Sequence, residues 1–293
     1  MTKTRSDDLI HAVKVGARMI KVYVAAYVVL GILGLMYTAV SAPPLPSDIT
    51  ELLSRGASNI TSAGNITANV ASLARWGVDY LIGFNIAGTY VISAVTSAIT
   101  GLALYLGIRI FSRVARKLRG RGLNGASGAI LVTSMVAAVT YAALSFWARS
   151  SLNDAYQVAL AATSNIHTLT SNNDVILALR EVAEAVRSLP LVRTAYIAAA
   201  ILEFSKAVAA AIAYILLGKV LRAPFSRVIA AFFVIQGGYD ALKEIMILTS
   251  HPATSFVMTA SGLIFVITAG RLLLQWANAS SIVKALTKEV KLH

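Results

Sequence analysis

Cysteine is absent from this chain of 293 residues, and histidine is scarce. Without cysteine, disulfide bonds and metal sites with thiolate ligands are excluded. The histidines fall outside the long apolar runs and none has a partner at the spacing of metal ligands, so we expect no haem, no zinc site and no cofactor. The four histidines are His11, His167, His251 and His293.

Nucleotide-binding and catalytic motifs are also missing. The pattern G-x-x-x-x-G-K-[ST] does not occur, so the chain does not hydrolyse ATP through a P-loop. Residues 120–125 match G-x-G-x-x-G, but no strand precedes them and an apolar run follows, which favours a flexible turn over a dinucleotide site. No nucleophile with a nearby base emerges. We therefore predict that the protein is not an enzyme.

Charged residues are few. They make up 13% of the sequence, whereas 57% of it is hydrophobic and the mean hydropathy is +0.71. A soluble globule of this size needs more polar surface than such a composition supplies. The composition therefore predicts a membrane protein whose main solvent, and first partner, is the lipid bilayer.

Six apolar runs are each long enough to cross a bilayer as a helix. About 20 apolar residues span the hydrocarbon core, in which unpaired backbone amides are not tolerated. We therefore predict an all-α polytopic membrane protein, with one transmembrane domain over residues 1–293 and its spans grouped as three hairpins. The predicted spans are residues 22–42, 80–108, 128–147, 191–218, 228–249 and 254–274.

Acidic residues number 13 against 26 lysines and arginines, and the basic residues are unevenly placed. Eighteen of them lie in residues 1–21, 109–127, 219–227 and 271–293, together with only three acids. The other polar segments are near neutral. Because basic segments stay in the cytoplasm, we predict a plasma-membrane protein with both termini cytoplasmic. The net charge of +13 thus mainly indicates orientation.

Two long outer segments, residues 43–79 and 148–190, are predicted to be helical. Residues 48–53 fit a short helix and residues 66–81 an amphipathic one. Asp174 is a suitable N-cap for a helix that ends before Pro190. We expect both segments to lie outside the cell.

The first outer segment contains two N-glycosylation sequons, at Asn59 and Asn65. The chain also has only three glutamines and no cysteine, a depletion of thermolabile residues that is typical of thermophiles. An archaeal membrane satisfies both observations.

Charges within the predicted spans are the most informative local feature, because each costs at least a few kcal/mol at the bilayer centre unless it is paired or hydrated. Glu203 and Lys206 share one face of the fourth span. A polar stripe marks one face of the fifth span at a similar depth. The stripe consists of Gln236, Gly237, Asp240, Lys243 and Glu244.

Two interpretations of these charges are open. In the first, they line a water-accessible polar path, or provide a carboxylate that binds a proton or cation during transport. In the second, Glu203 with Lys206 and Asp240 with Lys243 neutralise one another and join helices, while Glu244 reaches the outer interface. One carboxylate of the group is left over in either case.

A basic patch is predicted on the cytoplasmic side, within residues 109–121, which contain no acid. It would orient the protein and bind anionic headgroups, or else dock an acidic partner or guide a polyanion such as DNA. Arg271, near the inner end of the sixth span, is expected to extend to the headgroups in the same way. The patch consists of Arg109, Arg113, Arg116, Lys117, Arg119 and Arg121.

Three classes of function fit this sequence. The first is a channel or translocation component with protein partners, which the outer helices and the absence of an energy-converting motif favour. The second is a secondary transporter for a small solute or ion, for which six spans are few unless the chain forms a homo-oligomer. The third is a structural or assembly subunit of an envelope complex.

In architecture the chain resembles the polytopic channel component of crenarchaeal DNA-import systems, itself similar to the inner-membrane subunit of conjugation machines. The resemblance rests on the six spans, the outer helical segments 48–79 and 152–189, and a basic cytoplasmic side without a nucleotide motif. It implies that a separate ATPase powers transfer, that small membrane proteins are partners, and that DNA is the transported cargo.

Overall fold

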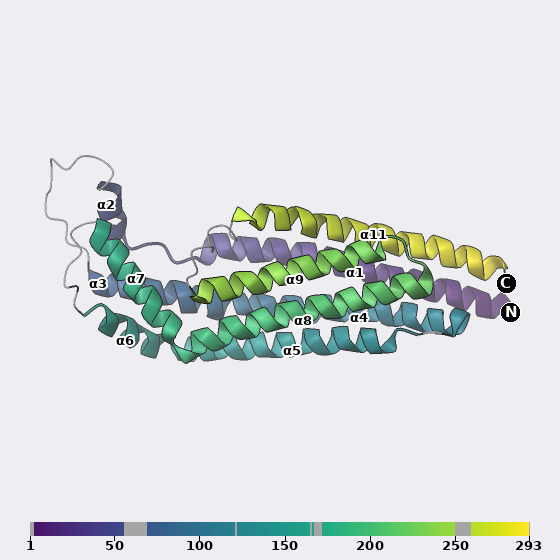
Figure 1. The fold of residues 1–293 in the computed structure, drawn as a ribbon, viewed down its shortest axis with the longest axis horizontal. Helices are drawn as coiled ribbons and strands as arrows, with labels where there is room; N and C mark the ends of the chain where they lie inside the picture. The colour runs from purple at the N-terminus through teal and green to yellow at the C-terminus, as the bar shows by residue number, and fades with distance from the viewer. Residues whose placement is uncertain are drawn as a thin grey trace. The chain divides into compact units, whose positions relative to one another are not determined.

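The computed structural model describes residues 3–55, 69–120, 122–164, 166, 172–249 and 259–292. Every regular element in these ranges is a helix and none is a strand, so the predicted all-α class is confirmed. Long and short helices follow one another along the chain (Figure 1). The elements are α1 (Lys3–Ser41), α2 (Ser47–Arg55), α3 (Val70–Val78), the π-helix η1 (Asp79–Gly88), α4 (Thr89–Arg119), α5 (Asn124–Ser150), α6 (Leu152–Ala162), α7 (Asn172–Ser188), α8 (Pro190–Leu221), α9 (Ser226–Thr249) and α11 (Ser261–Leu292).

Five helical stretches among the described residues are long and apolar enough to cross a membrane, so the chain is a polytopic membrane protein. α9 holds the fifth predicted span but is not one of the five, because Asp240, Lys243 and Glu244 interrupt its apolar sequence. The first residues of the sixth predicted span lie outside the described residues. The total of six spans therefore stays a prediction. The five stretches are Asp7–Ser41, Val70–Arg119, Asn124–Ser150, Pro190–Leu221 and Ser261–Glu289.

The chain divides into two compact units. Unit 1 comprises Met1–Ile32, Ser93–Thr140 and Ile197–His293, and unit 2 comprises Leu33–Ile92 and Tyr141–Tyr196. The division cuts α1, α4, α5 and α8. α9 and α11 belong wholly to unit 1, whereas α2, α3, η1, α6 and α7 belong to unit 2.

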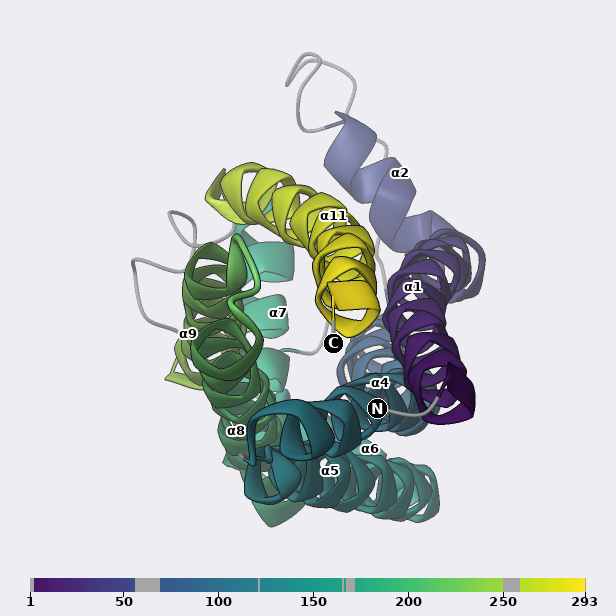
Figure 2. The same cartoon turned by 90° about the vertical axis from the view of Figure 1, so that its right-hand side faces the viewer.

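In unit 1, six helices surround a common core, in the order α1, α4, α5, α8, α9 and α11 (Figure 2). Small residues let these helices approach closely. A Cβ atom added to Gly101 of α4 would lie 2.1 Å from Cβ of Ser134 on α5, and one added to Gly237 of α9 would lie 2.2 Å from Cβ of Ala207 on α8. Both contacts therefore require glycine.

The outward faces of unit 1 carry large apolar side chains. Val132 is 61% exposed, Val139 70% and Leu273 72%. Exposed apolar surface on this scale marks a membrane-facing protein, since soluble proteins rarely tolerate it. Lipid is the solvent that accommodates these faces.

The four basic stretches meet at one end of unit 1. Arg119, at the end of α4, donates a hydrogen bond of 2.5 Å to the carbonyl oxygen of Val220 on α8 and forms an ion pair of 2.9 Å with Glu289 on α11. The start of α1 and the end of α11 lie at this same end (Figure 1). This arrangement agrees with basic segments on a single side of the membrane, and which side that is remains a prediction.

Unit 2 contains the predicted outer helices. One hydrophobic cluster in it consists of Ile49 from α2, Val70 and Leu73 from α3, and Val175 and Ala178 from α7. The short helix expected over residues 48–53 is α2, and the helix expected from Asp174 to Pro190 is α7, which begins two residues earlier, at Asn172. α6 packs against α7, so the two helices form a hairpin.

Hydrogen bonds fix the start of α3 in unit 2. The Asn69 side chain accepts a hydrogen bond of 2.8 Å from the Ala71 amide, as an N-cap does. The carboxylate of Asp48 on α2 accepts a bond of 3.1 Å from the Asn69 amide. Trp76 donates from its indole nitrogen to the carbonyl oxygen of Pro43, at 3.0 Å. Local polar contacts thus join α3 to α2 and to the segment between α1 and α2.

Candidate functional site: a polar cavity in unit 1

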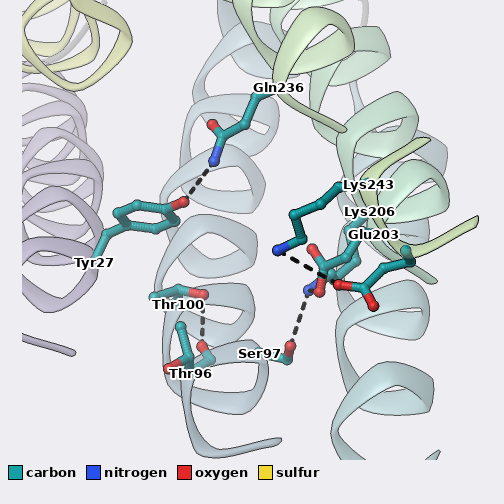
Figure 3. Close-up of polar contacts among 9 residues, drawn as sticks. Tyr27, Thr96, Ser97, Thr100, Glu203, Lys206, Gln236 and Lys243 are labelled. Atoms are coloured by element: carbon teal, nitrogen blue, oxygen red, sulfur yellow. Dashed lines mark hydrogen bonds and ion pairs between the residues drawn. The ribbon is translucent and has the colours of Figure 1, made fainter. Parts of the chain in front are cut away.

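Glu203 and Lys206, the predicted charged pair of the fourth span, lie on α8 and face α4. Lys206 Nζ lies 2.7 Å from Glu203 Oε1, as their spacing of three residues on a helix allows. It also donates a hydrogen bond of 3.0 Å to Ser97 Oγ on α4 (Figure 3). The Lys206 side chain is 21% exposed and that of Glu203 28%, so the ion pair is only partly buried.

On α9, Lys243 pairs with its neighbour Glu244. The distance between Lys243 Nζ and Glu244 Oε1 is 3.5 Å. The interpretation in which Lys243 pairs with Asp240 therefore differs from the structure. Within the described residues, Asp240 makes no ion pair.

Gln236, one turn before Asp240 on α9, is bound to a tyrosine of α1. Its amide nitrogen donates a hydrogen bond of 2.7 Å to the hydroxyl of Tyr27 (Figure 3). Its amide oxygen is buried and has no hydrogen-bond partner in the described residues. A buried acceptor of this kind is usually satisfied by a water molecule or a ligand.

Glu203, Lys206, Gln236 and Asp240 line a partly open cavity of about 90 Å³ in unit 1, which has room for a few water molecules. All six helices of unit 1 contribute to it. Four of the six predicted polar residues line it, whereas Lys243 and Glu244 do not. The lining residues are Tyr23, Tyr27, Thr100, Gly101, Leu104, Ile130, Ser134, Glu203, Lys206, Ala207, Ala210, Phe233, Gln236, Gly237, Asp240 and Arg271.

Arg271 of α11 lines this cavity, so the expectation that it extends to the headgroups is wrong. The residue is only 1% exposed. Its Nη1 donates a hydrogen bond of 2.8 Å to the Tyr23 hydroxyl, and its guanidinium lies 4.2 Å from the ring centre of Phe233 and 4.9 Å from that of Tyr27. Packing against aromatic rings turned the side chain inward instead of along the helix to the surface.

The Arg271 guanidinium is incompletely satisfied. Its Nε and Nη2 have no hydrogen-bond partner, and no carboxylate in the described part of the chain forms an ion pair with it. Nε and Nη2 lie on one edge of the planar group, the edge that binds an oxyanion with two parallel hydrogen bonds. This cation lies in the same cavity as Asp240, whose carboxylate makes no direct ion pair within the described residues, although Lys243 and Lys206 are close enough to attract it.

Arg271 changes the charge balance expected from the sequence. Counting only α8 and α9 leaves one carboxylate over. The charged residues that line the cavity are Glu203, Lys206, Asp240 and Arg271, two of each sign. The cavity is therefore neutral overall, although only Glu203 and Lys206 form a direct pair.

α11 carries a buried polar stripe that the sequence analysis missed. Gln275 donates a hydrogen bond of 3.0 Å to the Tyr214 hydroxyl on α8, and Asn278 donates one of 3.3 Å to Ser226 Oγ on α9. Gln275 is 0% exposed and Asn278 1%. They follow Arg271 by four and seven residues, which places all three on one helix face. This spacing in the sequence could have predicted the stripe. The stripe extends from the cavity toward the α8–α9 turn, at the end of unit 1 where the basic stretches meet.

The predicted basic patch is partly exposed and partly occupied by intramolecular contacts. Arg113, Arg116 and Lys117 are exposed. Arg119 is engaged by Glu289 and Val220 as described above, and Arg109 lies over the ring of Tyr105, 5.5 Å from its centre. Arg121 lies outside the described residues, as do the sequon residues Asn59 and Asn65.

Comparison with known proteins returned no match to a family model, to a curated protein or to a solved structure.

Proposed function

We propose that this chain is an integral membrane translocation component, in which the polar cavity of unit 1 is part of a path for small charged species. One observation carries the proposal: charged side chains from α8, α9 and α11 converge on a single cavity inside a bundle whose outer faces are apolar.

The energetics favour a hydrated path over a purely structural cluster. A charge in the membrane interior costs at least a few kcal/mol unless it is paired or hydrated. Asp240 and Arg271 have no ion-pair partner within the described residues, and the cavity has room for the water that would solvate them. The polar stripe of α11 would continue this path toward the basic end of unit 1.

The size of the cavity limits what one chain could pass. A volume of about 90 Å³ suits protons, small ions and water, and it is too small for a polymer. In a machine that moves DNA, the cavity would be a coupling site or one wall of a channel built from several chains. Because the sequence has no P-loop, the driving force would come from an ion gradient or from a separate ATPase.

Removal of the Asp240 charge tests this proposal. We expect Asp240→Asn, in vesicles that contain the purified protein, to lower proton or potassium flux about tenfold or more, because the unpaired carboxylate is the group able to bind the moving cation. The measurement is dye-reported flux per folded protein. Asp154→Asn, the same change at an exposed site on α6, is the matched control. Unchanged flux with a lowered melting temperature would show that these charges only stabilise the packing of the helices.

DNA is the second candidate cargo, and the exposure of Arg113, Arg116 and Lys117 near the basic end of unit 1 favours it. Cations that contact DNA phosphates release counterions, so each contact contributes about −0.9 to the slope of log K against log salt. We expect replacement of these three residues by glutamine to make the slope for duplex DNA shallower by about 3.

The matched control for DNA binding is the triple variant Arg149→Gln, Arg180→Gln and Arg193→Gln, which removes the same charge from exposed positions in unit 2. An equal loss in both triple variants would mean that the patch only adds general positive charge.

Affinity purification in mild detergent tests whether the chain belongs to a larger translocation complex. A co-purifying ATPase supports the translocation component, and a pure stable dimer supports a secondary transporter.

A further inference from the structure

A groove between α1 and α11, at the basic end of unit 1, gathers four cations. Lys14, Arg18 and Lys21 contribute from α1, and Lys284 contributes from α11. The groove has a volume of about 280 Å³, and its lining contains no acidic residue. Its remaining lining residues are Ala17, Ser280 and Val283.

The sequence explains how the cations reach one place. Lys14, Arg18 and Lys21 are spaced by four and three residues, so they lie on one face of α1. Three positive charges on one helix face repel one another, and a fourth from α11 adds to the repulsion. A bound anion would relieve that cost.

No internal carboxylate supplies that relief. Within the described residues, none of the four cations forms an ion pair, whereas Arg119 at the same end is paired with Glu289. Lys21 instead lies over the ring of Trp276, with its Nζ 4.8 Å from the ring centre. The groove is therefore a cationic site that the described part of the chain does not neutralise.

The surroundings of the groove indicate where its ligand comes from. Trp276 is 46% exposed, and tryptophan prefers the boundary between headgroups and hydrocarbon. Val22, the residue after Lys21, is exposed, and so is Leu273, one turn from Trp276 on α11. The apolar surface of unit 1 thus begins where the groove ends, which is the depth of lipid phosphates.

We propose that this groove is a binding site for the headgroup of an anionic phospholipid, with Lys14, Arg18, Lys21 and Lys284 around the phosphate and Trp276 at the start of the acyl chains. Basic pockets between transmembrane helices bind anionic headgroups in this manner. The site is separate from the polar cavity and does not depend on the translocation proposal.

Lipid retention measured by native mass spectrometry tests the site. The full chain, purified in detergent, is mixed with phosphatidylglycerol or with phosphatidylcholine. We expect the double variant Arg18→Gln and Lys284→Gln to bind phosphatidylglycerol about 25-fold more weakly, because each cation near the headgroup is worth about a factor of five. Arg18→Lys keeps the charge and should retain the lipid.

The matched control is Arg149→Gln with Arg193→Gln, which removes two exposed cations outside the groove. Equal loss in the groove variant and this control would overturn the proposal, as would equal retention of phosphatidylcholine. Inorganic phosphate that binds as tightly as the lipid would assign the groove to a free anion. Loss of duplex DNA binding without loss of lipid would assign it to nucleic acid. Size-exclusion profiles confirm that each variant is folded.

Discussion

At the scale of one residue, Arg271 shows that stability alone does not explain the charges in the cavity. Burial of an unpaired guanidinium costs several kcal/mol, and each N–H left without a partner adds about 1–3 kcal/mol. Against this stand two ring contacts, worth up to about 2 kcal/mol each, and one hydrogen bond to Tyr23. These contributions at best offset the cost, so stability alone does not account for an arginine here.

The variant Arg271→Met separates stability from function. Methionine fills a similar volume without a charge, and replacement of a buried charge by an apolar side chain is often neutral or stabilising. We expect the melting temperature in detergent to stay the same or rise, while ion flux in vesicles changes at least tenfold. Arg193→Met, at an exposed position of α8, is the control. A clear fall in melting temperature with unchanged flux per folded protein would contradict this expectation.

At the scale of helices, the close approach of α8 and α9 brings Glu203, Lys206, Gln236 and Asp240 to one cavity. The contact depends on Gly237, which lies against Ala207. The adjacent Gly238 has open space where a Cβ would be, although it belongs to the same helix. Replacement of Gly237 or of Gly238 by alanine changes helix propensity by the same amount. Only the packing around the added methyl group differs between the two positions.

We expect Gly237→Ala to lower the free energy of unfolding by about 1–3 kcal/mol, because the added methyl group overpacks the contact between the two helices. Gly238→Ala should be neutral or slightly stabilising, since alanine favours a helix over glycine. Thermal unfolding in detergent measures both. Equal effects of the two substitutions would show that α8 and α9 are not in tight contact at this point.

At the scale of the whole molecule, the predicted orientation in the membrane rests on the four basic stretches, which lie at one end of unit 1. Because a cluster of lysines and arginines is costly to move across the bilayer, we expect this end of unit 1 to lie on the cytoplasmic side. The start of α1 and the end of α11 lie at the same end of unit 1, as an even number of crossings requires. The number of spans depends on whether α9 crosses the membrane. It is the one predicted span that is not among the helices apolar enough to cross, because of its charges.

Because the chain has no cysteine, single cysteines can report this topology without background. We expect Asp8→Cys and Lys288→Cys to react with a membrane-impermeant thiol reagent only after the cells are opened, and Asn153→Cys to react in intact cells. All three positions are exposed in the structure. If Asp8→Cys and Lys288→Cys reacted from opposite sides, α9 would not cross the membrane, and the number of spans would be odd.

The sequence by itself determined the class of the fold, the membrane environment and most helix positions. These follow from local properties: the length of apolar runs, the placement of prolines and the segregation of lysine and arginine. The same reasoning grouped six polar residues at a similar depth, because helical spacing and residue rise are sufficient for that: Glu203, Lys206, Gln236, Asp240, Lys243 and Glu244. It also anticipated α2 and α7, whose apolar spacing is regular.

Only the tertiary structure decided which of these side chains share a cavity and what completes it. Arg271 sits near the end of a span, where sequence alone favours extension to the headgroups, and packing against Phe233 and Tyr27 turned it inward. The partners of Gln236 and Gln275 are tyrosines from α1 and α8, more than 60 residues away along the chain. Such pairings depend on the order of helices around the bundle and on the close contact at Gly237, which no local pattern specifies.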